Sequence, residues 1–124
     1  MKILISNDDG YGAEGIVILE DVVKNITDDY YIVAPDGHRS AAGHSISIRN
    51  PLYLKKYDER HFSVSGTPAD CVVMACSKVI KDKKPDVVLS GINNDKNYGN
   101  DVTTSGTFAV AIEGLFQGVK KCFA

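Results

Sequence analysis

The order of short apolar runs and amphipathic stretches limits this chain to few folds. Residues 2–6 form an apolar run that ends in the turn residues Asn7-Asp8-Asp9-Gly10, which predicts a buried strand and a loop. Residues 14–26 carry apolar side chains at helical spacing, which predicts a helix with one apolar face. A second apolar run at residues 30–34 ends at Pro35. Strand, helix and strand in this order predict a parallel pair joined by a right-handed crossover.

The rest of the chain continues this alternation with one interruption. Residues 45–56 alternate apolar and polar side chains around Asn50-Pro51, which predicts a β-hairpin. Further strands are expected at residues 62–65 and 86–90, and further helices at residues 68–80 and 105–118. Together these elements predict one α/β domain, a doubly wound sheet with a β-hairpin insertion. The chain ends at residues 121–124, where an α/β unit normally places a strand, so the domain is predicted to be incomplete there.

Composition and charge exclude several classes of protein. The 124 residues suit a single domain, and a net charge of -2 argues against binding to duplex nucleic acid. No apolar run is long enough to span a membrane, and no signal segment is present. An odd count of three cysteines (Cys71, Cys76 and Cys122) favours a reducing compartment, and their spacing favours core thiols over metal ligands. We therefore expect a cytoplasmic protein.

Polar side chains gather in the loops that follow the predicted strands. In open α/β sheets, ligands bind beyond the carboxyl ends of the strands, which directs attention to residues 7–15, 35–45, 65–68 and 90–107. Asp8 and Asp9 are adjacent carboxylates whose mutual repulsion a hard cation would relieve. Oxygen ligands favour Mg²⁺, Mn²⁺ or Ca²⁺, and the alternative is a polar turn that binds nothing.

The last of these loops supplies further ligand candidates. Residues 90–101 contain four asparagines, whose amide oxygens can bind a metal, although a plain surface loop would also be rich in Asn. Ser105-Gly106-Thr107 opens the last predicted helix. Its free backbone N–H groups favour an anion, and Ser105 can equally act as an N-cap. Both interpretations are compatible with each other.

Other chemistries are less compatible with this sequence than a metal site. His44, and less so His38 and His61, could act in acid–base catalysis, but a single histidine is more often structural. The chain has no dinucleotide-binding glycine motif, no phosphate-loop lysine motif, no nucleophile elbow and no zinc spacing. A response-regulator receiver domain shares the acidic pair. Its phosphoacceptor Asp would stand at position 90, where this chain has Ser90.

A series of different short motifs is spread along nearly the entire chain. They are Asn7-Asp8-Asp9-Gly10, Ala34-Pro35, Arg39-Ser40, Gly43-His44-Ser45-Ile46, Gly66-Thr67-Pro68-Ala69-Asp70-Cys71-Val72, Ser90-Gly91-Ile92-Asn93, Asp101-Val102 and Ser105-Gly106-Thr107. Each motif is weak alone, but the ordered set resembles the SurE family of stationary-phase survival proteins. That resemblance implies a Rossmann-like, mostly parallel fold and a metal-dependent phosphatase of nucleoside monophosphates. It also implies that full-length relatives are homo-oligomers.

The resemblance also implies a set of site residues. One divalent metal ion, Mg²⁺ or Mn²⁺, is expected at four positions: Asp8, Asp9, Ser40 and Asn93. Five further residues match positions around the bound phosphate: Gly43, Asn97, Ser105, Gly106 and Thr107. On this hypothesis Asp8 or Asp9 orients or deprotonates a water molecule that the metal activates, with no covalent phosphoenzyme.

Three departures from the family pattern bear on activity. The family usually carries a Gly-containing step where this chain has Asn94-Asp95-Lys96, and an aromatic residue or His where it has Thr104. Both bear on substrate preference more than on metal binding. Family members are also about twice as long, so an alternative function is a non-catalytic fragment that binds metal or nucleotide. The sequence leaves open the base, the 5′ or 3′ ester, the native metal and the oligomeric state.

Overall fold

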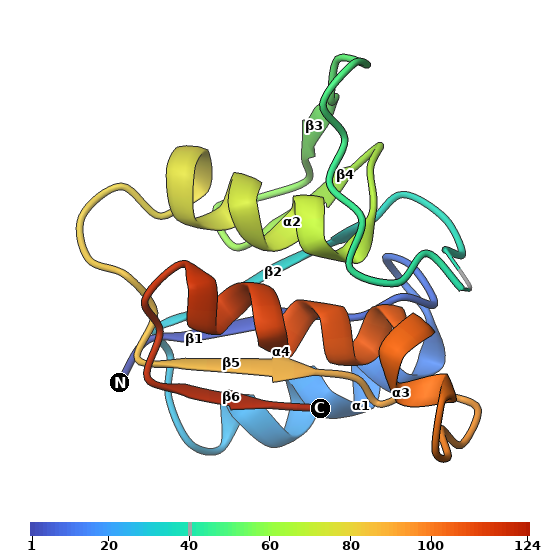
Figure 1. The fold of residues 1–124 in the computed structure, drawn as a ribbon. Coiled ribbons are helices and arrows are strands. Elements are labelled where there is room, and N and C mark those ends of the chain that lie inside the picture. The colour runs from blue at the N-terminus through green and yellow to red at the C-terminus, as the bar shows by residue number, and fades with distance from the viewer. Residues whose placement is uncertain (40) are drawn as a thin grey trace.

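A mostly parallel sheet forms the centre of the molecule. In the computed structural model, the described residues, 1–39 and 41–124, form a six-stranded sheet in the order β3-β4-β2-β1-β5-β6 (Figure 1). The strands are β1 (Ile3–Ser6), β2 (Tyr30–Pro35), β3 (Leu54–Lys56), β4 (His61–Val64), β5 (Val87–Ser90) and β6 (Lys121–Phe123). Neighbouring strands pair in parallel, except β3 and β4, which are antiparallel. The predicted mostly parallel α/β fold is confirmed.

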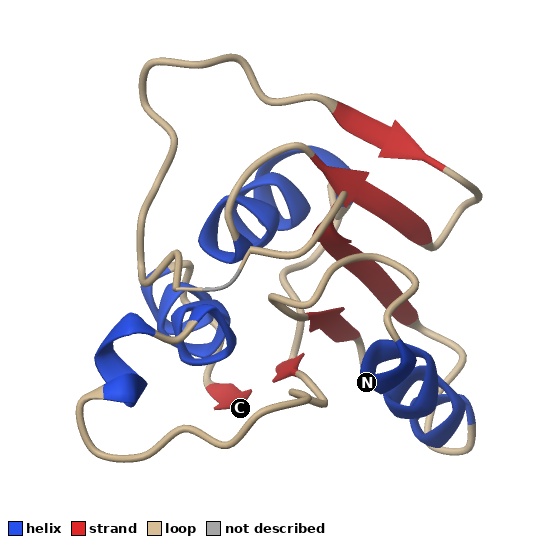
Figure 2. Cartoon of the chain, turned by 90° about the vertical axis from the view of Figure 1, so that its right-hand side faces the viewer, coloured by secondary structure: helices blue, strands red, loops and turns tan. Residues whose placement is uncertain are grey.

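Helices cover both faces of this sheet. Figure 2, seen toward the carboxyl edge of the strands, shows α1 (Glu14–Lys24) on one side of the sheet. The other side carries α2 (Pro68–Met74), which continues as the π-helical turn η1 (Ala75–Val79), and α4 (Gly106–Phe116). This arrangement is the doubly wound architecture that the alternating sequence pattern predicts.

The core lies in two layers because successive strand residues point to opposite faces. On β1, Ile3 and Ile5 pack in the layer beneath α1 with Ile16 and Val23. Leu4 instead belongs to the layer beneath α2 and α4. Each fully buried aliphatic side chain stabilises the fold by about 1.5–3 kcal/mol relative to an exposed one. Burial in the two layers therefore keeps the helices packed against both faces of the sheet.

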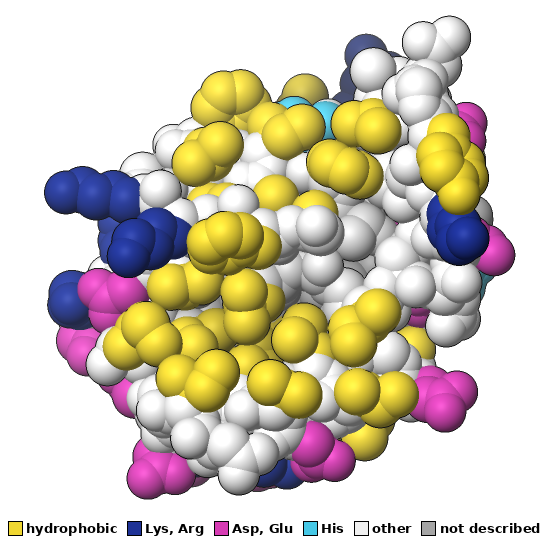
Figure 3. Space-filling view, turned by 90° about the horizontal axis from the view of Figure 1, so that it is seen from below, with side chains coloured by type: hydrophobic (Ala, Val, Ile, Leu, Met, Phe, Trp, Pro, Cys, Tyr) yellow, Lys and Arg dark blue, Asp and Glu magenta, His cyan; other side chains and the backbone are white. Residues whose placement is uncertain are grey.

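One face of the molecule remains rich in exposed apolar side chains. Figure 3 views the molecule from the side that carries α1, and apolar side chains are spread over much of that surface. Val22 and Ile26, which the helical spacing assigned to the buried face, are 52% and 58% exposed. Ile18 is also exposed. The prediction that α1 has a single apolar face is therefore wrong, because the helix carries apolar residues on both sides.

The predicted hairpin over residues 45–56 is wrong. Residues 45–53 have no regular structure, and Ile48 is 90% exposed. The antiparallel pair lies instead between β3 and β4, with Leu54 opposite Val64. Its turn is stabilised by the Asp58 carboxylate, which accepts the backbone N–H groups of Arg60 and His61 at 2.8 and 2.9 Å. Pro51 cannot donate a ladder hydrogen bond, which disfavours pairing in the earlier segment.

Element boundaries differ from the sequence predictions by a few residues. α1 ends at Lys24, the helix that begins at Pro68 changes to π geometry after Met74, and α4 ends at Phe116. A short helix, α3 (Asp101–Thr104), lies in a segment predicted as loop. The last residues form a strand, β6, at the place where an α/β unit requires one.

The three cysteines differ in how far they are buried. Cys71 is buried, whereas Cys76 and Cys122 are partly buried, and all three are free thiols. Burial raises the pKa of the Cys71 thiol well above its ordinary value, which keeps it unreactive. Among the residues that the structure describes, no helix combines the length and hydropathy needed to cross a bilayer.

Candidate active site

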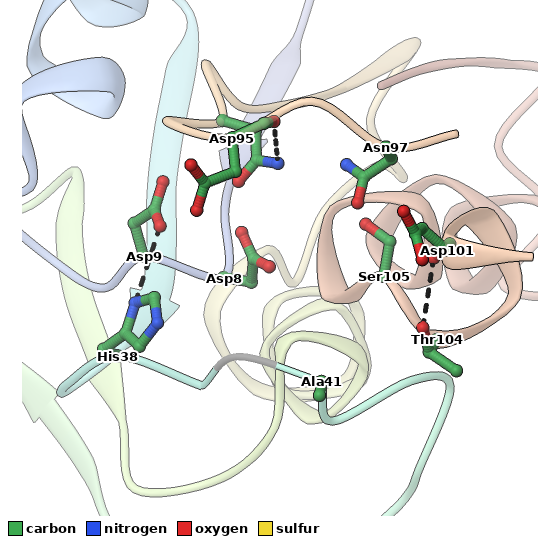
Figure 4. Close-up of a pocket in the computed structure, with 10 residues that line it drawn as sticks. Asp8, Asp9, His38, Ala41, Asp95, Asn97, Asp101, Thr104 and Ser105 are labelled. Carbon is green, nitrogen blue, oxygen red and sulfur yellow. Dashed lines mark hydrogen bonds and ion pairs between the residues drawn. The ribbon is translucent and has the colours of Figure 1, made fainter. Parts of the chain in front are cut away.

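A polar cavity opens at the carboxyl edge of the sheet, where the loops after β1, β2 and β5 meet the start of α4. Its volume is about 160 Å³. Figure 4 shows the side chains that surround it. The residues that line it are Asp8, Asp9, His38, Ala41, Asn93, Asp95, Asn97, Asp101, Thr104 and Ser105. They come from three loops that are far apart in the sequence, so the parallel fold alone brings them together.

Asp8 is a carboxylate held in a buried position. The turn after β1 is fixed by the Asn7 side chain, which donates to the Gly10 carbonyl at 2.9 Å and accepts from the Gly10 N–H at 3.1 Å. Asp8 is only 7% exposed, and the Thr107 hydroxyl donates to its Oδ1 at 2.9 Å. Burial raises the pKa of Asp8, with a further contribution from the charge of Asp9, while the Thr107 hydrogen bond opposes the shift.

Asp9 connects two of the loops around the cavity. Its Oδ1 lies 3.5 Å from Nδ1 of His38 in the loop after β2. Its Oδ2 accepts the backbone N–H of Asn94 at 3.3 Å in the loop after β5. The side chain of Asp9 is 8% exposed. Asp8 and Asp9 are thus adjacent, nearly buried carboxylates, an arrangement that a cation would stabilise.

The start of α4 lies directly against Asp8. Ser105 is the N-cap of α4, and its hydroxyl accepts the Phe108 N–H at 3.4 Å. A Cβ on Gly106 would stand 2.7 Å from Cβ of Asp8 and 2.8 Å from Cγ of Pro68, so the helix can approach this closely only with glycine there. The positive end of an 11-residue helix therefore faces the acidic cavity, which suits an anion such as phosphate.

The loop after β5 contributes both expected and unexpected residues. Asn93 and Asn97, which sequence analysis selected, line the cavity. The Asn93 side-chain N–H donates to the Asp95 carbonyl at 2.6 Å. Asp95 and Asp101 also line the cavity but were not selected. Both stand in the same Asn-rich segment, and that position could have identified them, but only its asparagines were taken as ligand candidates.

The predicted site residues separate into three groups. Asp8, Asp9, Asn93, Asn97 and Ser105 line one cavity, and Gly106 and Thr107 contact Asp8 beside it. Gly43 does not line the cavity, and its N–H already donates to the Thr104 carbonyl at 3.0 Å, so its phosphate role stays a prediction. Ser40 lies outside the described residues.

The three histidines occupy different places. His38 lines the cavity beside Asp9. His44 lies outside it and contacts Glu113 of α4, with 2.6 Å between His44 Nε2 and Glu113 Oε2. His61 lies between Asp58 and Glu20. It belongs to β4, which β2 separates from β1 and the acidic pair. Of the three, only His38 is placed to act near the carboxylates.

The chemistry of the donors can be compared with that of a metal site. Within residues 1–39 and 41–124, no three His, Cys, Asp or Glu side chains converge tightly enough to hold a metal. The expected set of metal ligands contains two such residues, Asp8 and Asp9. Its other members offer an amide oxygen and a hydroxyl oxygen. Oxygen donors of this kind suit a hard divalent cation that keeps some of its water. The residues present therefore fit Mg²⁺ or Mn²⁺.

The chain is similar to known proteins over nearly its whole length. Residues 3–122 match the family model described as survival protein SurE. The chain is 50% identical over 119 residues to a 5′-nucleotidase SurE of Paramagnetospirillum magneticum, covering 96% of this chain and 46% of that protein. It is 47% identical over 120 residues to a 5′-nucleotidase SurE of Chelativorans sp., covering 97% of this chain and 47% of the relative.

A solved structure agrees with these relatives. The crystal structure of the SurE protein from Aquifex aeolicus superposes with a TM-score of 0.91 at 42% identity. The match covers 98% of this chain and 49% of that one. The chain therefore spans about half the length of the relatives that it matches.

Proposed function

The chain belongs to the SurE family, and we propose on this basis that it is a metal-dependent phosphatase that hydrolyses nucleoside monophosphates. The observation that carries the proposal is the position of Asp8. This buried carboxylate stands between a second carboxylate, Asp9, and the N-terminus of α4, which Thr107 ties to it. One cavity thus offers a site for a cation beside a site for an anion.

Each of the residues around the cation has a defined task in this proposal. Asp8 and Asp9 would hold a divalent cation together with Asn93 and Ser40. When bound, the cation supplies Lewis acidity that activates water and a phosphoryl oxygen. Asp8 or Asp9 orients or deprotonates the attacking water. The Thr107 hydroxyl fixes the rotamer of Asp8 through its 2.9 Å hydrogen bond, so the carboxylate is already oriented.

Other residues stabilise the phosphoryl group. The free backbone N–H groups of Gly106 and Thr107 at the start of α4 face the negative charge that grows on the phosphoryl oxygens. The Asn97 amide lines the same cavity and can donate a hydrogen bond to these oxygens. No side chain needs to form a covalent bond to phosphorus, because positioning and electrostatic stabilisation carry most of such a reaction.

The size of the cavity limits which part of the substrate it encloses. Its volume of about 160 Å³ lies below the roughly 300–1,000 Å³ that is usual for small-molecule pockets. That space suits a phosphate group and a partly hydrated cation. The sugar and base of a nucleoside monophosphate would then extend outside the residues that line the cavity.

The three free cysteines support a reducing, cytoplasmic location for this activity.

Phosphate release provides the direct test. The wild-type chain, incubated with Mn²⁺ or Mg²⁺ and a nucleoside monophosphate, should release inorganic phosphate, and the chelator EDTA should stop it. Asp9→Asn should lower the rate by at least about 100-fold, because a cation ligand is lost. Asp21→Asn is the matched control, since Asp21 is an exposed Asp on α1 whose carboxylate pairs with Lys24.

The result also separates the two candidate functions. Turnover close to wild type in Asp9→Asn would contradict the proposed site. Saturable binding of the metal by the wild-type chain without any phosphate release would instead favour the alternative, a non-catalytic module that binds metal or nucleotide.

A further inference from the structure

A buried carboxylate on α4 has no role in the mechanism proposed above. Glu113 is only 6% exposed, and it lies on a helix whose other buried residues are apolar or small. Burying a carboxylate is costly unless hydrogen bonds compensate the lost hydration. Glu113 has two such partners: His44, at 2.6 Å, and Gln117, whose Nε2 donates at 2.7 Å. The pairing with His44 joins α4 to a distant loop.

His44 is held at this position from two directions. In the tautomer that carries its hydrogen on Nε2, His44 donates this hydrogen bond to Oε2 of Glu113. The ring also stacks on Phe116, one turn further along α4, with 5.4 Å between ring centroids and 19° between planes. The hydrogen bond and the stacking together fix the orientation of the ring against the helix.

The segment that carries His44 meets the cavity at Ala41. Ala41 lines the cavity and adopts a left-handed backbone conformation with φ of 55°. Such a conformation persists in a non-glycine residue only when the surroundings impose it. The Gly43 N–H donates to the Thr104 carbonyl at 3.0 Å, next to the start of α4. On the other side, the Arg39 N–H donates to the backbone carbonyl of Asp8 at 2.8 Å.

The anchors along this segment differ in kind. The contacts of Arg39 and Gly43 are single backbone hydrogen bonds, which water can replace. The contact between His44 and Glu113 pairs an imidazole with a buried carboxylate, so its loss would leave Glu113 with Gln117 alone. Of these three anchors, the contact with Glu113 is the one made by a buried carboxylate, and His44 lies three residues from Ala41 in the cavity wall.

We propose that His44 is a positioning residue: together with Glu113 it forms a latch that holds the segment 41–44 in place, so that Ala41 lines the cavity, and thereby raises the affinity of the site for a divalent cation. The inference rests on the function proposed above, because the cation site is the one defined there. His44 acts through Ala41 and Gly43, since it does not itself line the cavity.

Two variants break or keep the latch. His44→Phe preserves an aromatic ring to stack on Phe116 but removes the hydrogen bond to Glu113. Glu113→Gln is the conservative variant, because its amide oxygen can still accept the hydrogen bond from the His44 N–H. His61→Gln is the matched control, because His61 also contacts two carboxylates, Glu20 and Asp58, but lies outside the cavity. Thermal unfolding checks that each variant folds, and His44→Gln replaces His44→Phe if the latter does not.

Two readouts are measured on each variant. The first is backbone amide hydrogen exchange at Gly43 without metal, which reports the latch independently of any activity. In His44→Phe it should be at least about tenfold faster than in the wild type, because the Thr104 hydrogen bond loses its support. The second is the Kd for Mn²⁺, which should rise about tenfold in His44→Phe, as for other residues that orient metal ligands. Glu113→Gln should lie much closer to the wild type, and His61→Gln should match it.

Each contrary result has a definite meaning. Unchanged exchange at Gly43 in His44→Phe would overturn the latch, even in an active phosphatase. Faster exchange with an unchanged Mn²⁺ Kd would overturn its role at the cation site. A wild-type chain that binds Mn²⁺ without turnover would overturn only the proposed function, whereas one that binds no Mn²⁺ would overturn both.

Discussion

At the scale of single residues, Asp8 shows the conflict between stability and function most clearly. The fold holds this carboxylate 7% exposed, beside another carboxylate, and supplies one hydroxyl as compensation. Burial raises its pKa, so the folded chain binds a proton on Asp8 more tightly than the unfolded chain does. Without a cation, the ionised form therefore destabilises the fold.

This conflict predicts how Asp8→Asn changes stability with pH. Because the pKa of Asp8 is raised above 3.8 in the fold, the native state binds more protons, and wild-type stability falls as pH rises through that raised pKa. Asp8→Asn has no charge to bury, and its amide oxygen can still accept from Thr107. In EDTA, the variant should unfold about 2–6 °C above the wild type at pH 7. The difference should shrink toward pH 4.

Thermal unfolding by circular dichroism across this pH range checks the prediction. Asp21→Asn, at an exposed position, should show no such trend. A wild-type chain as stable as Asp8→Asn at pH 7 in EDTA would show that the buried carboxylate carries no cost.

At the scale of elements, the site depends on how closely α4 approaches the end of β1. Gly106 permits this approach, since a Cβ would meet Asp8 and Pro68 at 2.7 and 2.8 Å. Gly106→Ala should improve the intrinsic helix propensity by up to about 1 kcal/mol. The clash should nevertheless displace the start of α4 and break the hydrogen bond between Thr107 and Asp8.

We therefore expect Gly106→Ala to lose both stability and phosphate affinity. Chemical denaturation and competition by inorganic phosphate measure the two quantities. Gly37→Ala is the matched control, because a Cβ there meets nothing closer than 3.5 Å, a flexible Arg39 atom. A Gly106→Ala variant that is more stable than the wild type, with the same phosphate affinity, would mean that the close contact is not needed.

Elements with strong local signals were predictable from sequence, and those set by tertiary contacts were not. β1, α1 and β2 follow from apolar runs and turn residues. The misplaced hairpin shows the limit: the alternation around Asn50-Pro51 is a weak signal, and the true turn depends on Asp58 hydrogen bonds. The outward apolar residues of α1 satisfied the same helical spacing as the buried ones, so the spacing could not tell them apart.

At the scale of the whole molecule, parallel topology explains why polar residues of separate loops could be predicted to lie close together. Loops at the carboxyl ends of parallel strands meet at one edge, so Asp8, Asn93 and Ser105 had to be neighbours once the fold was identified. Asp95 and Asp101 stand in the Asn-rich loop but were not singled out, and neither their side-chain positions nor the contact of His44 with Glu113 could be foreseen. Their positions depend on loop conformation and on which face of α4 meets the loop, neither of which has a periodic signal.

The claim on which this account depends is that Asp8 and Asp9 hold a divalent cation, and calorimetric titration with Mn²⁺ at pH 7 tests it most directly. The wild-type chain should show saturable binding to one site, and Asp9→Asn should bind at least about tenfold more weakly, because a ligand is missing. Asp21→Asn should bind as the wild type does. Absence of saturable binding in the wild type, or equal affinity in Asp9→Asn, would contradict the account.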